Sequence, residues 1–599
     1  MRLVLGVRGF PRQGALILSR EASVATKHEP CFNMLLIKCD VYFTLRFMIK
    51  RMQVIDFFCG AGGFSEGFRQ AGYDIVMGID NWQPAITTHN ANHALTDTPK
   101  SVLDFENLDE IDKLPNTEII VGSPPCVLFS LSNRGGNANK DLGIRQIEAF
   151  FRVVAVKKHQ KNSSLVAWLM ENVPNSRNYV REKYTFSNLG LSGWAKANNI
   201  HPNATAIRVK NNGDILHADD YGSGQARKRF VCGELTKDGR FPVPDKIENQ
   251  DKSLNAIFSN FPKPFEILKS DYIVDPNYEN ICIRPEDLRD HHYDSGVYEI
   301  EWRKAQEAKQ NHPYMGRMFF PENRQNPSRT IMATKSSSTR EAILYKSEIA
   351  RSGDGEYRTP TIREAAIIMG FPITYQFFGD ESTKWRQIGN AVCVQLAYAL
   401  AEKIREQSGF RLPEPKNTTY KFEGFTFLDN ESKKTFSHPP TRNPNALFRA
   451  HPIKSGNMTI DLTNRAGKNK DNWGVVAHTG TGKGYGLTEI SKIHFEEARA
   501  EIVRTMPEFI TSIHADACIK PYTDKIFNQK NAEYGYLSFD SGHPYQIVKR
   551  VESYIVKAVN GKGDYLVDAN GTQLASIKEK IPISQILAIY SLGILLYDK

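Results

Sequence analysis

Short apolar runs alternate with stretches of helical periodicity over the first part of the chain. The strand-like run Val54–Phe58 leads into the glycine turn Gly60–Gly63, and a helical stretch follows to Ala71. Another strand-like run, Asp74–Ile79, ends directly before Asp80. This alternation predicts an α/β fold, with a mostly parallel sheet that helices cover on both faces. Further apolar runs stand at Glu118–Val121, Val166–Met170 and Phe230–Cys232.

The alternation stops over residues 234–326, which are rich in Pro, Asn, Asp and aromatic residues. Residues 412–445 are rich in Pro, Asn and Lys, which is typical of a linker. Residues 446–599 return to a globular composition and predict a C-terminal α+β domain. Later helices are expected at Thr361–Met369, Ala391–Arg405, Leu487–Met506 and Pro544–Val559, and a hairpin at Tyr565–Ser576.

Composition and cysteine use narrow the class of protein. The chain has 599 residues, 40% hydrophobic and 24% charged, which is enough for several domains of about 100–200 residues each. Its eight cysteines form no CxxC pair, so we expect no metal site and a reducing compartment. The apolar run Ile581–Tyr597 is interrupted by Gln585 and Gly593 and is shorter than the roughly 20 residues of a membrane span. We therefore expect a soluble cytoplasmic protein without membrane contact.

Positive charge is concentrated at the N-terminus. Residues 1–52 hold nine Lys and Arg but three acidic residues, so they carry six of the ten net positive charges. This basic extension is either a targeting peptide or, as we prefer, a stretch ahead of a true start at Met48 or Met52. The rest of the chain is nearly balanced, so bulk charge alone does not indicate a nucleic-acid-binding protein.

The glycine turn and Asp80 together suggest a site for a nucleotide-like cofactor. Glycines let the backbone approach a ligand, and the N-terminus of the following helix offers free N–H groups. An acid at the end of the next strand, where Asp80 stands, can hold ribose hydroxyls. The alternative is that the glycines only allow the strand and the helix to pack tightly.

Candidate reacting groups stand beside other strands of the predicted sheet. Cys126 ends the sequence Ser123-Pro124-Pro125-Cys126, on a loop that could present a nucleophile. Glu171 follows the next strand and could give or take a proton. Arg227 and Arg229 could hold phosphates or a base edge. The structural alternatives are a small buried cysteine, a helix-capping acid and a solvated basic loop.

These motifs, taken in order, resemble the DNA cytosine-5 methyltransferase family over about residues 53–405. The last of them contains Asn390, which we expect to cap the helix that follows. Val127 departs from the family's usual Gln after the cysteine, and Gly224 from its Pro before the arginine motif. Neither departure removes a reacting group. In chain order the motifs are Phe57–Gly63, Asp80, Asp104, Pro124–Cys126, Glu171–Val173, Gln225–Arg229 and Gln387–Val392.

The resemblance implies a Rossmann-like fold and methyl transfer from S-adenosylmethionine to cytosine C5 in a specific duplex DNA sequence. Cys126 would form the covalent adduct, Glu171 would recognise the cytosine, and Arg227 and Arg229 would help to hold the flipped base. The glycines of Leu131–Gly136 suit a mobile lid over that base. The cofactor would be held by Phe57, Gly60, Gly62, Gly63, Asp80, Asp104, Asn390 and Val392.

The resemblance also implies a division of the chain. Residues 53–233 and 327–411 would form the catalytic domain, with residues 234–326 as an inserted target-recognition region. The partner would be double-stranded DNA, and the setting a restriction-modification or related DNA-marking system with a monomeric enzyme. A cognate restriction endonuclease is a candidate partner. A catalytically silent DNA-binding protein and an RNA methyltransferase are the alternatives for the whole chain.

No family resemblance covers residues 446–599. The turn Gly480–Gly484 is not a phosphate-binding loop, because Ala477 replaces its first glycine and Gly484 its Ser or Thr. One alternative is a fused restriction nuclease, and the other, which we prefer, is a binding module for DNA or a partner. Candidate nuclease residues are Glu414, Lys416, Glu431, Lys433, Asp540, His543, Asp564 and Asp568.

Overall fold

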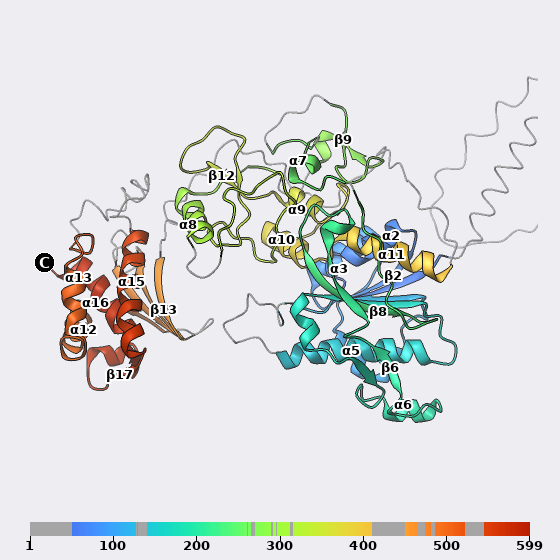
Figure 1. The fold of residues 1–599 in the computed structure, drawn as a ribbon, viewed down its shortest axis with the longest axis horizontal. Helices are drawn as coiled ribbons and strands as arrows, with labels where there is room; N and C mark the ends of the chain where they lie inside the picture. The colour runs from blue at the N-terminus through green and yellow to red at the C-terminus, as the bar shows by residue number, and fades with distance from the viewer. Residues whose placement is uncertain are drawn as a thin grey trace, which may run out of the picture. The chain divides into compact units, whose positions relative to one another are not determined.

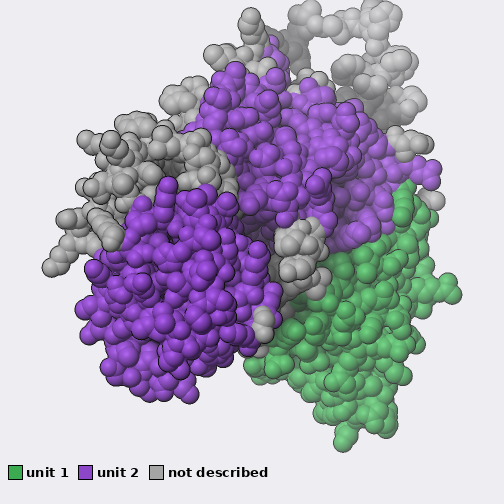
Figure 2. All heavy atoms as spheres, turned by 60° about the vertical axis from the view of Figure 1, so that its left-hand side comes forward, with its two compact units in different colours: residues 1–216, 229–246, 396–417 green, residues 217–228, 247–395, 418–599 purple. Residues whose placement is uncertain are grey.

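The computed structural model describes the main predicted regions, but neither the N-terminal extension nor the linker. Val127 and Leu131–Gly136 also lie outside the described residues, as do Glu414, Lys416, Glu431, Lys433, Asp540 and His543. The chain divides into two compact units, each of which is considered by itself (Figure 2). The described residues are 51–126, 129, 140–248, 250–259, 261–264, 270–288, 292–294, 296–311, 316–409, 450–463, 474–480, 486–521 and 544–598.

Unit 1 comprises the described residues of 1–216, 229–246 and 396–417, and contains a six-stranded sheet. The strand order is β2-β1-β3-β4-β8-β7, in which β2, β1, β3 and β4 are parallel and β8 runs antiparallel to β4. The prediction of a mostly parallel sheet is confirmed. The strands are β1 (Gln53–Phe57), β2 (Asp74–Ile79), β3 (Ile119–Gly122), β4 (Ala167–Asn172), β7 (Gly213–His217) and β8 (Lys228–Leu235).

Helices cover both faces of this sheet (Figure 1). Helix α5 (Lys140–His159) lies on one face, and α2 (Gly63–Gln70), α3 (Gln83–His93) and α11 (Val394–Ser408) lie on the other. The shorter elements of the unit are η1 (Val102–Glu106), α4 (Leu108–Asp112), η3 (Pro174–Asn178), β5 (Lys183–Thr185), α6 (Ser192–Ala197) and β6 (Thr205–Arg208).

The core of unit 1 explains why its central strands are apolar throughout. All four residues of β3 and all six of β4 are buried, as expected for parallel strands covered on both faces. Phe150 of α5 packs edge-on against Phe57 and Trp168, with ring centroids 5.6 and 6.4 Å apart. Each such side chain stabilises the fold by about 1.5–3 kcal/mol through burial, and together they fix the strand ends that carry the candidate site.

Unit 2 contains the remaining described residues, and its part between residues 217 and 395 has short elements and two small cores. The weak periodicity of residues 234–326 therefore corresponds to sparse secondary structure. The helix expected over Thr361–Met369 is confirmed as α9 of this unit. The helix expected over Ala391–Arg405 begins at Val394 and is α11 of unit 1. The elements are η4 (Ala218–Tyr221), α7 (Leu254–Ile257), β9 (Ile273–Val274), β10 (Cys282–Ile283), η5 (Pro285–Asp287), α8 (Glu299–Gln310), β11 (Tyr345–Lys346), β12 (Tyr357–Arg358), α9 (Ile362–Ile368) and α10 (Glu381–Asn390).

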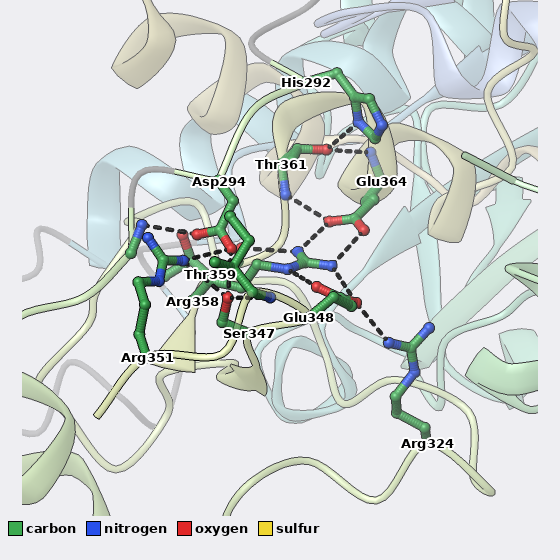
Figure 3. A network of polar contacts seen from close by, with 12 residues as sticks. His292, Asp294, Arg324, Ser347, Glu348, Arg351, Arg358, Thr359, Thr361 and Glu364 are labelled. Atoms are coloured by element: carbon green, nitrogen blue, oxygen red, sulfur yellow. Dashed lines mark hydrogen bonds and ion pairs between the residues drawn. The ribbon is translucent and has the colours of Figure 1, made fainter. Parts of the chain in front are cut away.

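A buried ionic network stabilises this irregular part of unit 2 (Figure 3). The guanidinium of Arg358 donates to Glu348 at 2.8 and 3.0 Å, and to Glu364 at 2.8 and 2.9 Å. Glu364 also closes a capping box with Thr361 at the start of α9. Burial alone would raise the pKa of Glu364, but the attraction of Arg358 lowers it overall. The network thus joins the β11–β12 hairpin to α9.

The C-terminal part of the chain is an α+β domain, as predicted. An antiparallel sheet orders β13 (Ala450–Ser455), β14 (Met458–Thr463), β15 (Gly474–Thr479) and β16 (Gly486–Glu489) in sequence. Helix α16 (Ile583–Tyr597) lies between this sheet and the other helices, so its apolar surface is buried on all sides. No helix in the described part of the chain is long and apolar enough to cross a membrane. The remaining elements are α12 (Lys492–Thr505), α13 (Pro507–His514), α15 (Pro544–Lys562), β17 (Leu566–Asp568), η8 (Gln573–Ser576) and β18 (Lys580–Pro582).

Two sequence predictions in this domain are wrong in their boundaries. The helix expected over Leu487–Met506 begins at Lys492, because Leu487–Glu489 pairs with β15 as strand β16. The hairpin expected over Tyr565–Ser576 pairs Leu566–Asp568 with Lys580–Pro582, and a short 3-10 helix occupies the connection. In both cases pairing with a partner strand overrides the local helical or turn pattern.

Candidate active site

The glycine turn follows β1 and has the backbone conformation that a close ligand approach requires. Gly60 and Gly62 have φ values of 53° and 93°, in the left-handed region that favours glycine. The N–H of Gly62 donates to the carbonyl of Cys59 at 2.8 Å, and Gly62 is the N-cap of α2. A Cβ added at Gly60 would meet only the carbonyl of Phe58, 3.9 Å away, so the turn is open at this position.

Asp80 lies directly beside this turn, as predicted from its place after β2. Its Oδ2 atom accepts the N–H of Gly60 at 3.1 Å, and its Oδ1 atom accepts the N–H of Trp82 at 2.9 Å. The carbonyl of Asp80 accepts the N–H of Lys100 at 2.8 Å, which attaches the segment leading to Asp104. Asp104 is exposed in η1. The structure therefore gathers the glycine turn, Asp80 and the segment of Asp104 at one edge of the sheet.

The ring of Phe57 does not face this edge. It is 0% exposed and packs between the rings of Phe105 and Phe150, with centroids 5.4 and 5.6 Å away. The next residue, Phe58, has a φ of 54° and is half-buried at the start of the turn. The expectation that the Phe57 side chain contacts the cofactor therefore needs correction, because this residue contributes core packing and backbone. Phe58 is the aromatic residue that the turn presents.

Three buried polar side chains next to the glycine turn form a hydrogen-bonded series that supports it. Oδ2 of Asp56 accepts from the hydroxyl of Ser65 at 2.7 Å and from its N–H at 3.2 Å. The same hydroxyl lies 2.9 Å from Nε2 of His89. Burial raises the pKa of Asp56 to about 7, despite the two bonds from Ser65, and burial lowers the pKa of His89. These contacts fix the start of α2 against β1.

Cys126 follows β3 on a loop that is anchored at several points. The N–H of Ser123 donates to the carbonyl of Phe57 at 3.1 Å, and the Asn172 side-chain amide donates to the carbonyl of Pro124 at 2.9 Å. The N–H of Phe129 donates to the carbonyl of Cys126 at 3.0 Å. Cys126 is half-buried, whereas Cys59 is buried, and that burial raises its thiol pKa well above the ordinary value. Cys126 thus combines an anchored backbone with partial exposure of the residue.

Glu171 is held at both carboxylate oxygens. Nε of Arg229, on β8, donates to Oε1 at 2.7 Å, and the hydroxyl of Ser123 donates to Oε2 at 2.8 Å. Glu171 is 4% exposed and Arg229 is 7% exposed. Glu171 lies within β4, one residue before the end of the strand, and not after it. The ends of β3, β4 and β8 therefore bring Glu171 and Arg229 together with the loop of Cys126.

Arg227 lies in unit 2 and has a different environment from Arg229. It is 2% exposed, and its guanidinium donates to the carbonyls of Ile331 and Gly389 at 3.0 Å each, and of Ala391 at 3.3 Å. Its contacts are thus with the segment that contains Asn390 and Val392. Asn390 is exposed and ends α10, so the prediction that it caps the next helix is wrong. Val392 is buried.

Ser123 and Phe58 are site residues that the sequence reasoning did not assign. A signal for Phe58 was available, because side chains alternate along a strand and the two phenylalanines must face opposite sides. No local signal indicated that the Ser123 hydroxyl reaches Glu171, since the two residues are 48 positions apart. Among the described residues, no group of three or more His, Cys, Asp or Glu side chains could hold a metal ion.

Comparison with known families agrees with this geometry. A family model described as C-5 cytosine-specific DNA methylase matches residues 52–406, which is more than half of the chain. The chain belongs to this family. It is therefore a DNA cytosine-5 methyltransferase, and its methyl donor is S-adenosylmethionine.

Individual relatives cover the same region. The Type II methyltransferase M.HgiDI of Herpetosiphon aurantiacus is 29% identical over 374 residues, which is 59% of this chain and 94% of the relative. M.HgiGI of the same organism is 40% identical over 134 residues, or 21% of this chain and 94% of the relative. The solved methyltransferase EhMeth of Entamoeba histolytica is 15% identical with a TM-score of 0.39, over 60% of this chain and 99% of that one.

Proposed function

We propose that the chain methylates C5 of a cytosine within a specific sequence of double-stranded DNA, through a covalent bond between Cys126 and the base. The observation that carries this proposal is the group at the ends of β3, β4 and β8. There the Glu171 carboxylate is held between Arg229 and Ser123, on the loop that leads to Cys126. A thiol, an acid and a cation at one sheet edge are the groups that this reaction uses.

The open glycine turn and Asp80 fit S-adenosylmethionine. Gly60, Gly62 and Gly63 would let the backbone approach the cofactor, and Asp80 would accept from the ribose hydroxyls. Phe58 would contact the cofactor beside the turn. When bound, S-adenosylmethionine supplies an electrophilic methyl group. On the family resemblance, Asp104 would lie near the adenine, and Asn390 and Val392 would contribute from the C-terminal side.

Cys126 makes the first bond of the reaction. C5 of cytosine is not nucleophilic enough to take a methyl group unaided, so the Cys126 thiolate adds to C6 and raises electron density at C5. Glu171 gives a proton to N3 as the S–C6 bond forms, which prevents negative charge from building up on the ring. After methylation a base removes the C5 proton, the sulfur leaves C6, and N3 returns its proton to Glu171.

The reacting atoms lie inside a DNA duplex, so the cytosine must leave the base stack. Unstacking costs a few kcal/mol and is offset by contacts with the pocket and the phosphates. Arg229 would contribute by holding Glu171 toward the base. We assign Arg227 a positioning role, because its donors bind carbonyls of the segment that contains Asn390 and Val392.

The names of the relatives favour a restriction-modification setting, since M.HgiDI and M.HgiGI are both called Type II methyltransferases. We propose the same setting here, with a monomeric cytoplasmic enzyme and a separate cognate endonuclease. Residues 53–233 and 327–411 would form the catalytic domain, and residues 234–326 the target-recognition region. Residues 446–599, beyond a linker at 412–445, would bind DNA or a partner.

A fused nuclease is the weaker alternative for the C-terminal domain. The Asp564 carboxylate accepts from Ser455 and Ser584, and the Asp568 carboxylate accepts the N–H of Asn570 within its own turn. These contacts give both acids structural roles. A metal-dependent nuclease would instead need carboxylates gathered around an ion.

The test is transfer of tritium from labelled S-adenosylmethionine to unmethylated genomic DNA by the full chain and by Cys126→Ser. We expect label in a short repeated sequence context, read by bisulfite sequencing, and none with the variant. Label on RNA but not on DNA would contradict the proposed substrate. Binding of S-adenosylmethionine and DNA without any transfer would instead indicate a silent DNA-binding protein.

A further inference from the structure

Ser123 connects the three parts of the candidate site. Its N–H donates to the carbonyl of Phe57, the last residue of β1 before the glycine turn. Its hydroxyl donates to Oε2 of Glu171 at 2.8 Å. Cys126 follows three residues later on the same loop. Ser123 therefore contacts both β1, which leads to the glycine turn, and Glu171. It also stands three residues before Cys126.

The two residues that follow Ser123 offer no backbone donor in place of this hydroxyl. Pro124 and Pro125 separate Ser123 from Cys126, and proline has no N–H. The hydroxyl is also distinct from the guanidinium of Arg229, which can only donate. A serine hydroxyl can both donate and accept, so it can keep a hydrogen bond when the carboxyl group gains or loses a proton.

We propose that Ser123 is a positioning residue for Glu171, holding its carboxyl group in the orientation in which it exchanges a proton with N3 of the cytosine. This inference rests on the proposed function and adds to it a residue that acts through Glu171. Arg229 fixes Oε1 from one side, and Ser123 fixes Oε2 from the other. With both oxygens held, the carboxyl plane cannot rotate without losing a hydrogen bond.

The prediction concerns the chemical step more than binding. Removing the hydroxyl should lower kcat by about 10- to 100-fold, the size expected for one hydrogen bond to a charged group. The KM values for S-adenosylmethionine and DNA should change by no more than about threefold, because Ser123 supplies no uniform binding energy to either. A threonine retains the hydroxyl and should restore most of the rate.

The experiment measures kcat and KM of the full chain with Ser123→Ala, Ser123→Gly and Ser123→Thr. Ser163→Ala is the matched control, because its hydroxyl accepts a turn hydrogen bond from Leu165 just before β4, at the opposite end from Glu171. Thermal unfolding and S-adenosylmethionine binding check that each variant folds. If Ser123→Ala misfolds, Ser123→Gly supplies the same deletion without a side chain.

A kcat loss in Ser123→Ala or Ser123→Gly, with KM nearly unchanged and rescue by Ser123→Thr, would support the proposal. Unchanged kcat, a loss confined to KM, or equal losses in the alanine and threonine variants would overturn it. These outcomes can be distinguished from a failure of the proposed function, because the Cys126→Ser variant tests that function directly. Label that persists in Cys126→Ser overturns both proposals, whereas Cys126-dependent label at the full rate in Ser123→Ala overturns only this one.

Discussion

Nε of Arg229 lies 2.7 Å from Oε1 of Glu171, and both side chains are almost completely buried. A buried carboxylate is costly unless it is paired, so the arginine allows an acid to occupy this strand end at all. The same pairing leaves the orientation of the acid fixed before any substrate binds. Each partner therefore affects both the stability of the protein and its reaction.

Replacement of Arg229 should separate these two effects. Arg229→Ala leaves Glu171 buried without its cation and should cost about 3–5 kcal/mol in the free energy of unfolding. Arg229→Lys keeps the charge but not the planar guanidinium, so it should fold better and still lose activity. Urea unfolding and methyl transfer would be measured together. Arg145→Ala is the control, since its exposed pair with Glu106 should contribute about 0–1 kcal/mol.

Glu171→Gln should remove proton transfer while keeping the size of the side chain. We expect kcat to fall by about 10²–10⁴-fold, the usual contribution of a general acid. The amide oxygen can still accept from Arg229, and the amide NH2 can donate to the Ser123 hydroxyl, so unfolding should change less than in Arg229→Ala. Single-turnover transfer to duplex DNA is the measurement. A variant that retains full activity would exclude Glu171 as the proton donor.

Stability should fall as pH rises through neutrality, partly because of Asp56. Burial raises its pKa from 3.8 to about 7 in the folded protein, so the folded state binds this proton more tightly than the unfolded state. That stabilising contribution is complete below the unfolded pKa and is lost as pH passes the folded pKa. From about pH 6.5 to about pH 8 the loss should be about 1 kcal/mol.

Asp56→Asn should flatten this part of the pH dependence, and urea midpoints across the window would show it. Asp214→Asn, at an exposed position on β7, is the control and should keep the wild-type slope. His89 titrates in the opposite sense, because burial lowers its pKa, and its effect appears below this window. Parallel slopes for wild type and Asp56→Asn would contradict the assignment.

Arg358→Ala should destabilise unit 2 more than any single surface pair does. It leaves the buried Glu364 and the half-buried Glu348 without their shared cation, at a cost of about 3–5 kcal/mol. Limited proteolysis and the thermal midpoint would report the change. Glu286→Ala, which breaks an exposed pair with Arg284, should have little effect. Equal effects of the two variants would mean that the network carries no special stability.

Gly593→Ala should destabilise the C-terminal domain selectively. A Cβ at Gly593 would lie 2.4 Å from Cδ2 of Phe495, which itself stacks on Tyr590. Overpacking of this kind costs about 1–3 kcal/mol. Val556→Ala, on the exposed side of α15, is the control. Hydrogen exchange in α12 and α16 should increase in Gly593→Ala and not in the control.

The sheet was predictable because its signal is local. Buried parallel strands such as β3 and β4 give unbroken apolar runs, and the motifs stand at their ends. Strand β16 and the partner of β17 were missed, because their identity depends on pairing with distant segments. Likewise, α10 and α11 are separated because the backbone becomes extended at Ala391. The helical sequence patterns on both sides of this residue do not reveal the break.

The sequence proposed members of the candidate site but not their contacts. Cys126, Glu171 and Asp80 were proposed from residue type and from positions at or just after strand ends, and their roles stay predictions. The sequence placed Arg227 and Arg229 in one motif, yet one binds backbone carbonyls and the other binds Glu171. The difference arises from which neighbouring segments fold against each residue, and no pattern within the motif encodes that.

The two prolines before Cys126 have an energetic consequence for substrate binding. Fixed φ angles at Pro124 and Pro125 restrict the conformations of this segment even when the protein is unfolded. The segment that carries Cys126 therefore loses less conformational entropy when it becomes ordered. The Asn172 side-chain amide restricts this segment further by donating to the Pro124 carbonyl. In the proposed reaction, contacts with DNA would therefore be available to extract the cytosine from the helix, because the segment that carries the Cys126 thiol would already be ordered when the base arrives.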